Sequence, residues 1–579
     1  MQYRYQNPNP TGEVRLQTTE PEAGITLLEL EIRFPEPCIP KPVCISWEEP
    51  CIDICAAIRF TGAFERTLGP DWSKKRGTAR FASCAPIYAW ISNDSQNRLT
   101  VALSDAETPT EIAGGIVEET GAIACDVRFF TQPVAPLTVY RATVRLDRRQ
   151  LRYEEVLRAA DAFWVSACGY PYATVPPAAR EAVYSCWYSF HQKLNGPAVL
   201  AQCRIARSLG MKTVIVDDGW QTDDNSRGYA TCGDWQAAPG KIPDMRGFAD
   251  AVHSLGMKLM LWYSVPFIGK ESAAYERLRD RTLGSIGKNW EALDPRYPEV
   301  RSYLTGLYTE AVTRWDLDGF KLDFIDSFAL NPNTKPFDPR WDTTSLEDGI
   351  NRLLRGITDA LRAVKPDILI EFRYSYFGPA VRRYGNMIRV GDCPDDPLRN
   401  RVHSIDMRYL TGRIPVHSDM LMWHPEDTPE AVAYQMITTL FCVPQISVAL
   451  DNLSGAQRAV LSFWLTFWQK HRETLLDGTL WGDHPEALYS QVRADGAKEL
   501  IAVAYTDPVL KTDLAKSAFL VNATGGDTLI LQHAGAPVTC SVTVRDCAGQ
   551  PVSCRELRLE TGAHAFPVPP CGLLEVSRP

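Results

Sequence analysis

The sequence predicts a multidomain α/β protein in which a central (β/α)8 barrel of the TIM type lies between two β-sandwich domains. Three observations support this fold class. The chain has 579 residues, more than one hydrophobic core usually organises. Its middle part alternates short apolar strands with amphipathic helices. Both end parts carry short, alternating apolar runs that Pro, Gly and Asn interrupt.

The first part of the chain, residues 1–175, is expected to form the N-terminal β-sandwich. Apolar and polar residues alternate at 25–34, 98–103 and 138–146, which is the pattern of strands with one buried face. A proline-containing stretch at 169–177 is expected to link this domain to the next one.

The middle part, residues 176–478, is expected to be the barrel. Candidate strands fall at 182–189, 213–217, 258–264, 319–324, 368–373, 387–391, 416–421 and 445–449. Helical patterns separate most of them, at 198–209, 248–255, 300–315, 346–364, 398–410 and 430–441. A doubly wound sheet is the runner-up, but no GxGxxG follows the first strand. Residues 479–579 again show the short apolar runs that are typical of strands, and they are expected to form a small, antiparallel C-terminal β-sandwich.

The composition is that of a globular enzyme and excludes several classes of partner. The formal net charge of −9 gives no sign of the excess of basic residues that nucleic-acid-binding proteins usually carry. No apolar run reaches the roughly 18 residues of a membrane span, and the first residues lack a signal-peptide core, so we expect a cytoplasmic protein. The 16 cysteines form no CxxC pair or zinc-knuckle spacing, which favours reduced thiols and predicts no metal site.

A barrel of this kind places its chemistry at the carboxyl ends of the strands. The polar and aromatic residues at those ends are, in strand order, Trp187, Asp217 with Asp218, Trp262, Lys321 with Asp323, Arg373, Arg389 with Asp392, and His417 with Asp419. Carboxylates therefore converge on one rim, whereas a random surface distribution would scatter them.

The segment DDGWQ at 217–221 is the most informative of these strand ends. Asp217 and Asp218 are adjacent acids after a hydrophobic strand, where repulsion and desolvation disfavour both charges unless something nearby uses them. Carboxylates accept hydrogen bonds from sugar hydroxyls, and an indole such as Trp220 can stack on the C–H face of a sugar. The segment alone is also compatible with a solvated βα loop.

Asp323 is the first candidate for catalysis. In GFKLDF, at 319–324, strand alternation places Lys321 and Asp323 on one face, toward the barrel mouth. A lysine two residues away would hold the aspartate ionised, as a nucleophile must be. The alternative is a buried ion pair with a structural role.

Asp392 is the second candidate, in RVGDCPDD at 389–396. A carboxyl group that is partly desolvated there could have the raised pKa that a general acid needs, although Arg389 pulls in the other direction. Asp395 and Asp396 are rivals, and the three acids could also merely cap a helix that begins near 397. Two acids that face each other across a sugar-binding pocket are typical of a glycosidase.

These motifs, together with GDW at 233–235 and KIPDMRGFADAVHSLGMKLMLWY at 241–263, resemble the α-galactosidases of glycoside hydrolase family 36, the melibiase type of clan D. The family typically has an N-terminal β-supersandwich, a (β/α)8 barrel and a C-terminal β domain, so the resemblance covers nearly the whole chain. It implies retaining hydrolysis of terminal α-galactosyl residues without a metal or organic cofactor. Members are often dimers to tetramers, which makes a homo-oligomer an expectation by analogy.

The resemblance also implies residue roles. Asp323 would be the nucleophile and Asp392 the acid/base. Residues that would contact the sugar are Asp217 and Asp218 at O4 and O6, Trp220 and Trp235 as pocket lining, and Lys321 and Arg389 at O2, O3 and O4. Trp187, Trp262 and Arg373, at the strand ends, complete the expected binding set. Trp72, in a loop GPDWS at 69–73, resembles the tryptophan with which the N-terminal domain lids the site.

Two departures from the family pattern bear on specificity. Residues 262–267 read WYSVPF where many members have WFEPEM, and residues 371–376 read EFRYSY in place of the family's CSGGG segment near the sugar 2-position. An α-N-acetylgalactosaminidase or galactosaminidase with the same mechanism is therefore an alternative. A raffinose-synthase-like transglycosylase and a non-catalytic sugar-binding protein are further readings.

Overall fold

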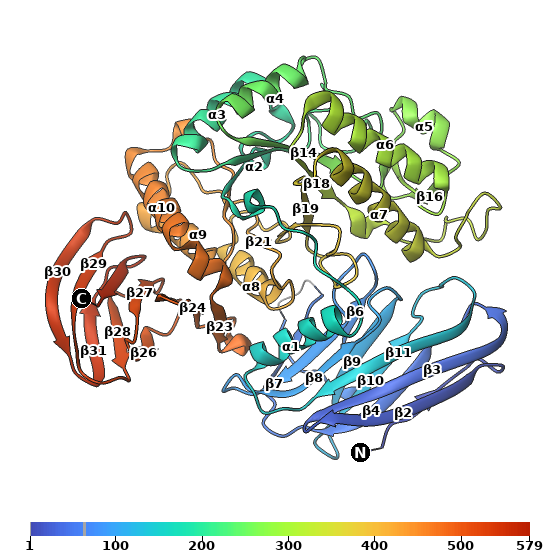
Figure 1. The fold of residues 1–579 in the computed structure, drawn as a ribbon, viewed down its shortest axis with the longest axis horizontal. Helices are drawn as coiled ribbons and strands as arrows, with labels where there is room; N and C mark the ends of the chain where they lie inside the picture. The colour runs from blue at the N-terminus through green and yellow to red at the C-terminus, as the bar shows by residue number, and fades with distance from the viewer. Residues whose placement is uncertain (1, 62–64, 579) are drawn as a thin grey trace.

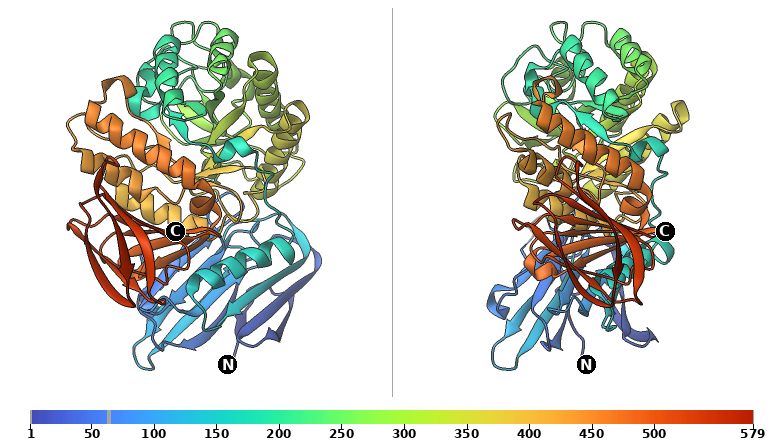
Figure 2. Two further views of the ribbon diagram at one scale, coloured as in Figure 1. Left: turned by 60° about the vertical axis from the view of Figure 1, so that its left-hand side comes forward. Right: turned by 90° about the vertical axis from the view of Figure 1, so that its left-hand side faces the viewer.

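The computed structural model describes residues 2–61 and 65–578. It has three parts: a barrel, an N-terminal sandwich and a C-terminal pair of sheets (Figure 1). In the further views both β parts lie on the same side of the barrel (Figure 2). The fold class expected from the sequence, a (β/α)8 barrel flanked by β-sandwiches, is confirmed.

The N-terminal sandwich consists of a five-stranded and a six-stranded sheet. In spatial order, the first contains β1 (Arg4–Gln6), β4 (Val43–Pro50), β10 (Ala122–Phe129), β9 (Thr110–Val117) and β6 (Lys75–Ala79). The second contains β2 (Glu13–Glu22), β3 (Ile25–Cys38), β11 (Leu137–Asp147), β8 (Asn97–Leu103), β7 (Ile87–Ile91) and β5 (Ala56–Arg59). Leu28, Leu30 and Ile32 of β3 are buried between the sheets, because alternate residues of a strand face one side. Helix α1 (Tyr153–Ser166) follows.

The barrel is an eight-stranded sheet with parallel neighbours. In spatial order its strands are β22 (Gln445–Ile446), β12 (Val183–Ser185), β13 (Thr213–Val216), β14 (Lys258–Ser264), β18 (Gly319–Asp323), β19 (Leu369–Arg373), β20 (Met387–Arg389) and β21 (Val416–His417). Two isolated parallel bridges, His417–Val443 and Leu421–Ile446, join the segments of β21 and β22 and close the ring.

Side chains define where the barrel helices begin. The helices are α3 (Gly196–Ser208), α4 (Met245–Ser254), α6 (Pro298–Trp315), α7 (Leu346–Val364), α8 (Pro397–Arg408), α9 (Pro429–Thr438) and α10 (Gly455–Asp477). Asn195, Asp244, Ser345, Asp396 and Thr428 each cap a first turn by accepting a hydrogen bond from a backbone amide. Asp396 is thereby assigned to the cap of α8.

The end of the first strand and the segment after β14 differ from the sequence expectation. The strand expected at 182–189 ends at Ser185, and the short helix α2 (Trp187–Phe190) follows it. After β14 the chain inserts a three-stranded antiparallel sheet that was not foreseen. This insertion contains β15 (Phe267–Gly269), α5 (Ala273–Leu278), β16 (Thr282–Ser285) and β17 (Trp290–Leu293).

The C-terminal part pairs a seven-stranded with a three-stranded sheet. The first contains β23 (Thr479–Asp483), β24 (Gln491–Asp495), β25 (Glu499–Ala504), β27 (Ser517–Asn522), β32 (Leu573–Ser577), β29 (Val538–Arg545) and β30 (Pro551–Leu559). The second contains β26 (Val509–Thr512), β28 (Thr528–His533) and β31 (Gly562–Pro567). Pairing is antiparallel except for β25 with β27 and β26 with β28, which are parallel.

Two arginines of the N-terminal sandwich tie it to the barrel. Arg80 donates to the backbone carbonyls of Asp326 and Phe328 at 2.6 and 2.9 Å, in the segment that follows β18. Arg66 donates to both carboxylate oxygens of Asp406 in α8 at 2.8 Å. The sandwich is therefore fixed to the loop that comes directly after Asp323.

All sixteen cysteines, each within the described part of the chain, are unpaired. Among the helices of residues 2–61 and 65–578, none combines the length and the apolar composition that a bilayer span requires.

Candidate active site

The ends of β14, β18 and β19 converge on one buried carboxylate, Asp323. Its Oδ1 accepts from Arg373 Nε at 2.6 Å and from the Phe324 amide at 2.8 Å. Its Oδ2 accepts from the indole of Trp262 at 3.0 Å. Burial raises the pKa of Asp323, but the positive charges of Arg373 and Lys321 outweigh burial and hold the pKa well below its usual range. Asp323 is therefore ionised at neutral pH.

Lys321, at the centre of β18, pairs with a different acid from the one expected. Its ammonium group donates to Asp217 Oδ2 at 2.6 Å, and both side chains are buried. Its charge still lowers the pKa of Asp323 through space, but the direct ion-pair partner of Asp323 is Arg373. The strand pattern indicated a cation near Asp323 and did not indicate which one makes contact.

Asp218 lies beside this pair and has amide partners. Gln192 and Gln221 donate to its two oxygens at 2.8 and 2.7 Å. Burial raises the pKa of Asp218 to about 6, with a further contribution from the neighbouring charge of Asp217. The two acids of DDGWQ thus differ, since one is neutralised by a lysine and the other is held by neutral donors.

Asp392 lies at the edge of the site, and its side chain is 58% exposed. Arg389, which is fully buried, donates from Nη2 to Asp392 Oδ1 at 2.8 Å. Burial raises the pKa of Asp392, but the positive charges of Arg389, Lys321 and Arg373 together outweigh burial and hold the pKa below its ordinary value. The guanidinium group also pairs with Asp419, and its Nε lies 3.7 Å from Glu371 Oε1. The structure therefore does not give Asp392 the raised pKa that the sequence suggested for a general acid.

The rivals of Asp392 have other partners. Asp395 accepts from Gln435 Nε2 at 2.8 Å, and burial raises its pKa with a contribution from Asp427. Asp396 caps α8. Among these acids, Asp392 is the one whose pKa responds to the charges of Asp323, Lys321 and Arg373. This proximity favours Asp392 over Asp395 as the second acid of the site.

The tryptophans expected to line the pocket have different surroundings. Trp262 is buried, with its indole nitrogen on Asp323. Trp220 is fully buried, donates to the Trp262 carbonyl at 2.9 Å, and packs against Trp235, Tyr263 and Trp315. In this structure the Trp220 ring therefore has no face open to a ligand. Trp235 is 3% exposed and packs edge-on against Trp262.

Trp187 and Trp72 are more exposed than the other three tryptophans of the expected site. Trp187 opens α2, is half-buried, and contacts His191 with ring centroids 4.5 Å apart. Trp72 lies in a short 3-10 turn, Asp71–Ser73, and its side chain is 70% exposed. Within the described part of the chain, no ring contact or hydrogen bond joins Trp72 to the barrel, so its role as a lid stays a prediction.

Several residues near the site escaped the sequence analysis as site members. Tyr188 donates to Asp419 at 2.9 Å, and Tyr229 stacks on Trp262 with centroids 6.1 Å apart. Gln192 and Tyr376 contact Asp218 and Asp323. Asp419 is the one with a signal in the sequence, since it follows the seventh strand. Tyr188 and Gln192 lie in the short helical turns that follow β12, and Tyr229 and Tyr376 lie in loops, so no sequence periodicity marks them.

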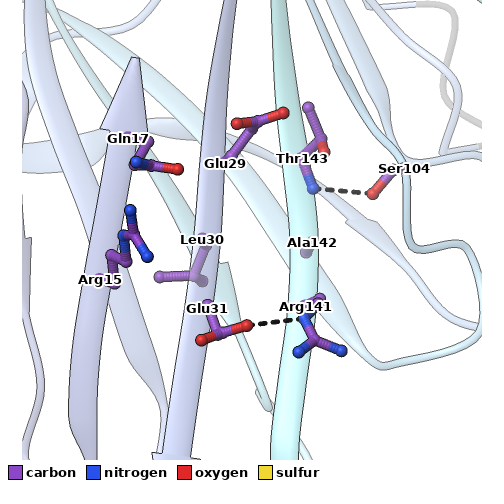
Figure 3. A pocket seen from close by; sticks show the side chains of 9 residues that line it. All are labelled: Arg15, Gln17, Glu29, Leu30, Glu31, Ser104, Arg141, Ala142 and Thr143. Carbon is purple, nitrogen blue, oxygen red and sulfur yellow. Dashed lines mark hydrogen bonds and ion pairs between the residues drawn. The ribbon is translucent and has the colours of Figure 1, made fainter. Parts of the chain in front are cut away.

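Elsewhere, the described residues contain no cluster of three or more His, Cys, Asp or Glu side chains with the geometry of a metal site. The N-terminal sandwich bears an open, polar depression across β2, β3 and β11 (Figure 3). In it, Glu31 pairs with Arg141 at 2.7 Å, and Thr143 N donates to Ser104 Oγ at 2.8 Å. Glu31 and Arg141 thus pair across a solvated sheet face, and the barrel rim remains the candidate active site.

A (β/α)8 barrel with two acids of different environment at its rim is the arrangement of the two-carboxylate glycoside hydrolases. Residues 178–375 match the Melibiase family model. The resemblance to the melibiase-type enzymes of glycoside hydrolase family 36 is thereby confirmed over this segment.

Characterised relatives agree with that match. The chain is 29% identical over 205 residues to the alpha-galactosidase Mel36A of Lactobacillus acidophilus, covering 33% of this chain and 27% of the relative. It is 27% identical over 169 residues to the alpha-galactosidase AgaA of Geobacillus stearothermophilus, covering 26% of this chain and 23% of the relative. The alignments thus span about a quarter of the length of these curated relatives.

The fold extends the likeness to the whole chain. The solved galactosidase domain of the alpha-galactosidase-sucrose kinase AgaSK superposes with a TM-score of 0.66, covering 100% of this chain and 85% of that one. The sequence identity over this superposition is 14%, so the likeness concerns the fold.

Proposed function

We propose that this protein is a retaining exo-glycosidase that hydrolyses terminal α-D-galactosyl residues of oligosaccharides or glycoconjugates. One observation carries the proposal. Asp323 is buried and ionised, because Arg373 contacts it and the ammonium group of Lys321 lies nearby. The second acid, Asp392, is exposed and lies close enough to Asp323 for that charge to affect its pKa. A nucleophile needs the first environment, and an acid/base that serves a departing oxygen and then water needs the second.

The reaction would proceed by double displacement. Asp323 attacks the anomeric carbon and forms a glycosyl ester, while the bond to the departing oxygen breaks and that oxygen takes a proton from Asp392. Water then attacks the same carbon, gives its proton to Asp392, and the ester bond breaks to return the Asp323 carboxylate. Two inversions leave the product sugar in its original α configuration.

The sugar would be held by the charged groups around Asp323. The Asp217–Lys321 pair offers an acceptor and a donor in one place, and Asp218 adds a second carboxyl group beside it. Arg389 supplies a buried donor. The names of the relatives support galactose as the sugar, and solved structures of AgaA variants are described with raffinose and with stachyose.

A second substrate class has a specific observation behind it. A galactosaminidase of Flavonifractor plautii, described as acting on A type blood alpha-D-galactosamine, is 23% identical over 171 residues, covering 26% of this chain and 15% of that protein. The β19 end also carries Arg373 in the segment that departs from the family pattern. Hydrolysis of an α-N-acetylgalactosaminide or α-galactosaminide is therefore the alternative, with transfer to a sugar acceptor as a further variant.

The test pairs two chromogenic substrates. Hydrolysis of p-nitrophenyl α-galactoside, absent for p-nitrophenyl α-N-acetylgalactosaminide and abolished in Asp323→Asn, is the expected result. Proton NMR of the first product should show α-galactose before mutarotation. Turnover of the second substrate alone would replace galactose by its 2-acetamido analogue, and β-galactose as first product would reject retention.

The proposal includes a cytoplasmic location. It is supported by the sixteen unpaired cysteines, because proteins of oxidising compartments usually pair such thiols.

A further inference from the structure

We propose that Arg373 is a positioning residue that holds Oδ1 of Asp323 and leaves Oδ2 as the atom that attacks the anomeric carbon. The inference rests on the proposed function and deepens it, since it assigns separate tasks to the two oxygens of the nucleophile. The residue that makes the contact lies in the segment at 371–376 where this chain departs from the family pattern.

The two carboxylate oxygens of Asp323 differ in the number of hydrogen bonds that they accept. Oδ1 accepts from Arg373 Nε at 2.6 Å and from the Phe324 amide at 2.8 Å, which takes both of its lone pairs. The Tyr376 hydroxyl lies 3.2 Å from Oδ1 and 3.0 Å from the Leu322 carbonyl, and it can donate to one of them at a time. Oδ2 has one donor, the Trp262 indole, at 3.0 Å. Oδ2 therefore keeps a lone pair for a carbon centre.

Arg373 is itself held in place. Its guanidinium carbon lies 5.1 Å from the Phe324 ring centroid and 5.9 Å from that of Tyr376. Its Nη1 donates to the Tyr374 carbonyl at 3.2 Å, and its side chain is 16% exposed. A planar guanidinium fixed by rings and a carbonyl presents Nε in one direction, so the carboxylate that accepts from it loses rotational freedom.

The contact has opposite effects on the two halves of the reaction. When Oδ2 bonds to the anomeric carbon, Asp323 becomes an ester, Oδ1 becomes a neutral carbonyl oxygen, and the charge-assisted hydrogen bond from Arg373 weakens. In the second half, the C–Oδ2 bond breaks, its electron pair returns to the carboxylate, and the full interaction with Arg373 forms again. Arg373 thus stabilises the carboxylate as a leaving group and favours hydrolysis of the ester.

The experiment compares Arg373→Gln, Arg373→Lys and Tyr376→Phe with the wild type. Tyr376→Phe is the matched control, because it removes the uncharged neighbour of the same oxygen and leaves the charge. The pH profile of kcat/KM on an aryl α-galactoside reports the ionisation of the free nucleophile. We expect the acid limb to move up by about one pH unit or more in Arg373→Gln, because a neighbouring opposite charge typically lowers a carboxyl pKa by roughly that amount. Arg373→Lys should restore most of the wild-type limb.

A second readout follows the ester directly. With 2,4-dinitrophenyl α-galactoside, Arg373→Gln should release a burst of dinitrophenolate equal to the enzyme concentration and then turn over about 10- to 100-fold more slowly than the wild type, as expected for the loss of a hydrogen bond to a charged group. A variant that is folded by circular dichroism yet keeps the wild-type acid limb and shows no burst would overturn the inference. If the wild type hydrolyses no α-galactoside, or Asp323→Asn stays active, it is the proposed function that fails.

Discussion

Arg389 Nη2 donates to Asp392 Oδ1 at 2.8 Å, and the same guanidinium pairs with Asp419 at the end of the neighbouring strand. The arginine is fully buried, whereas Asp392 is largely exposed. The lowered pKa of Asp392 favours its ionised form, whereas a general acid needs its proton. We expect the pair to loosen when a glycosidic oxygen approaches, while Asp419 and Glu371 keep Arg389 in place.

Replacement of Asp392 by Asn should affect substrates according to their leaving groups. Activated aryl galactosides need little protonation, so Asp392→Asn should retain much more activity on them than on alkyl galactosides or raffinose. The measurement is kcat/KM across a leaving-group series. Asp395→Asn is the control and should leave the series unchanged, because Asp395 bonds to Gln435. Equal losses on good and poor leaving groups would contradict the role of Asp392.

The role of Asp323 has a chemical test beyond loss of activity. In Asp323→Gly the proposed nucleophile is absent, and azide can attack the anomeric carbon from the vacated face. We expect added azide to restore turnover of an activated aryl α-galactoside and to give β-galactosyl azide, identified by NMR. Rescue that yields the α-azide, or no rescue in a folded variant, would place the nucleophile elsewhere.

The strands of the barrel were predictable where an apolar run forms an uninterrupted series of hydrogen bonds with the neighbouring strands. Residues 258–264 were expected as a strand and form β14. The strand expected at 416–421 stops at His417, because Ser418 and Leu421 bond to the β22 segment only intermittently, through Val443 and Gln445. The buried character of 418–421 was readable from the sequence, but the broken hydrogen-bond pattern was not.

The positions of the acids in the candidate site were predictable from the sequence, and their partners were not. Strand ends marked Asp217, Asp323 and Asp392 because parallel strands finish at one rim. Which cation contacts which acid depends on how neighbouring strands are offset, and the offset gives Lys321 to Asp217 and Arg373 to Asp323. Trp220 was expected to stack on a sugar, yet its indole is buried in the core and donates to the Trp262 carbonyl.

Arg80 should matter for catalysis although it belongs to another domain. It donates to the carbonyls of Asp326 and Phe328 and to Glu347, so it fixes the loop that follows Asp323. We expect Arg80→Ala to lower stability by about 2–3 kcal/mol, as for buried hydrogen bonds to a charged group, and to lower kcat. Arg76→Ala is the control, because Arg76 lies in β6, just before Arg80 in the chain, and its exposed side chain pairs with Glu111 of the same domain. Thermal unfolding and kcat measure the two effects, and equal behaviour of both variants would contradict this role.

The Lys321–Asp217 pair should show strong coupling. Loss of one partner leaves the other charge buried, so Lys321→Met and Asp217→Leu should each cost about 3–5 kcal/mol in the free energy of unfolding. The double variant should cost much less than the sum, because no unpaired charge remains. Urea denaturation of the four proteins measures the coupling. Additive losses would show that the pair contributes through packing alone.

Glu371 should give the protein a pH-dependent stability that can be removed by one substitution. It is fully buried in β19, where it accepts from Gln445, and burial raises its pKa from 4.5 to about 7 against the opposing charge of Arg389. Between these values the folded protein binds more protons at this carboxyl than the unfolded chain does. The contribution to stability is therefore complete below pH 4.5 and is lost as the pH rises through about 7.

Glu371→Gln keeps an acceptor for Gln445 and cannot ionise. The stability of the wild type, relative to this variant, should thus fall by on the order of 3 kcal/mol between pH 4.5 and 7, since one pKa unit corresponds to about 1.4 kcal/mol. Urea denaturation at a series of pH values, followed by tryptophan fluorescence, measures the difference. Parallel curves for the two proteins would mean that Glu371 stays ionised throughout, and that Arg389 compensates its burial fully across the 3.7 Å between them.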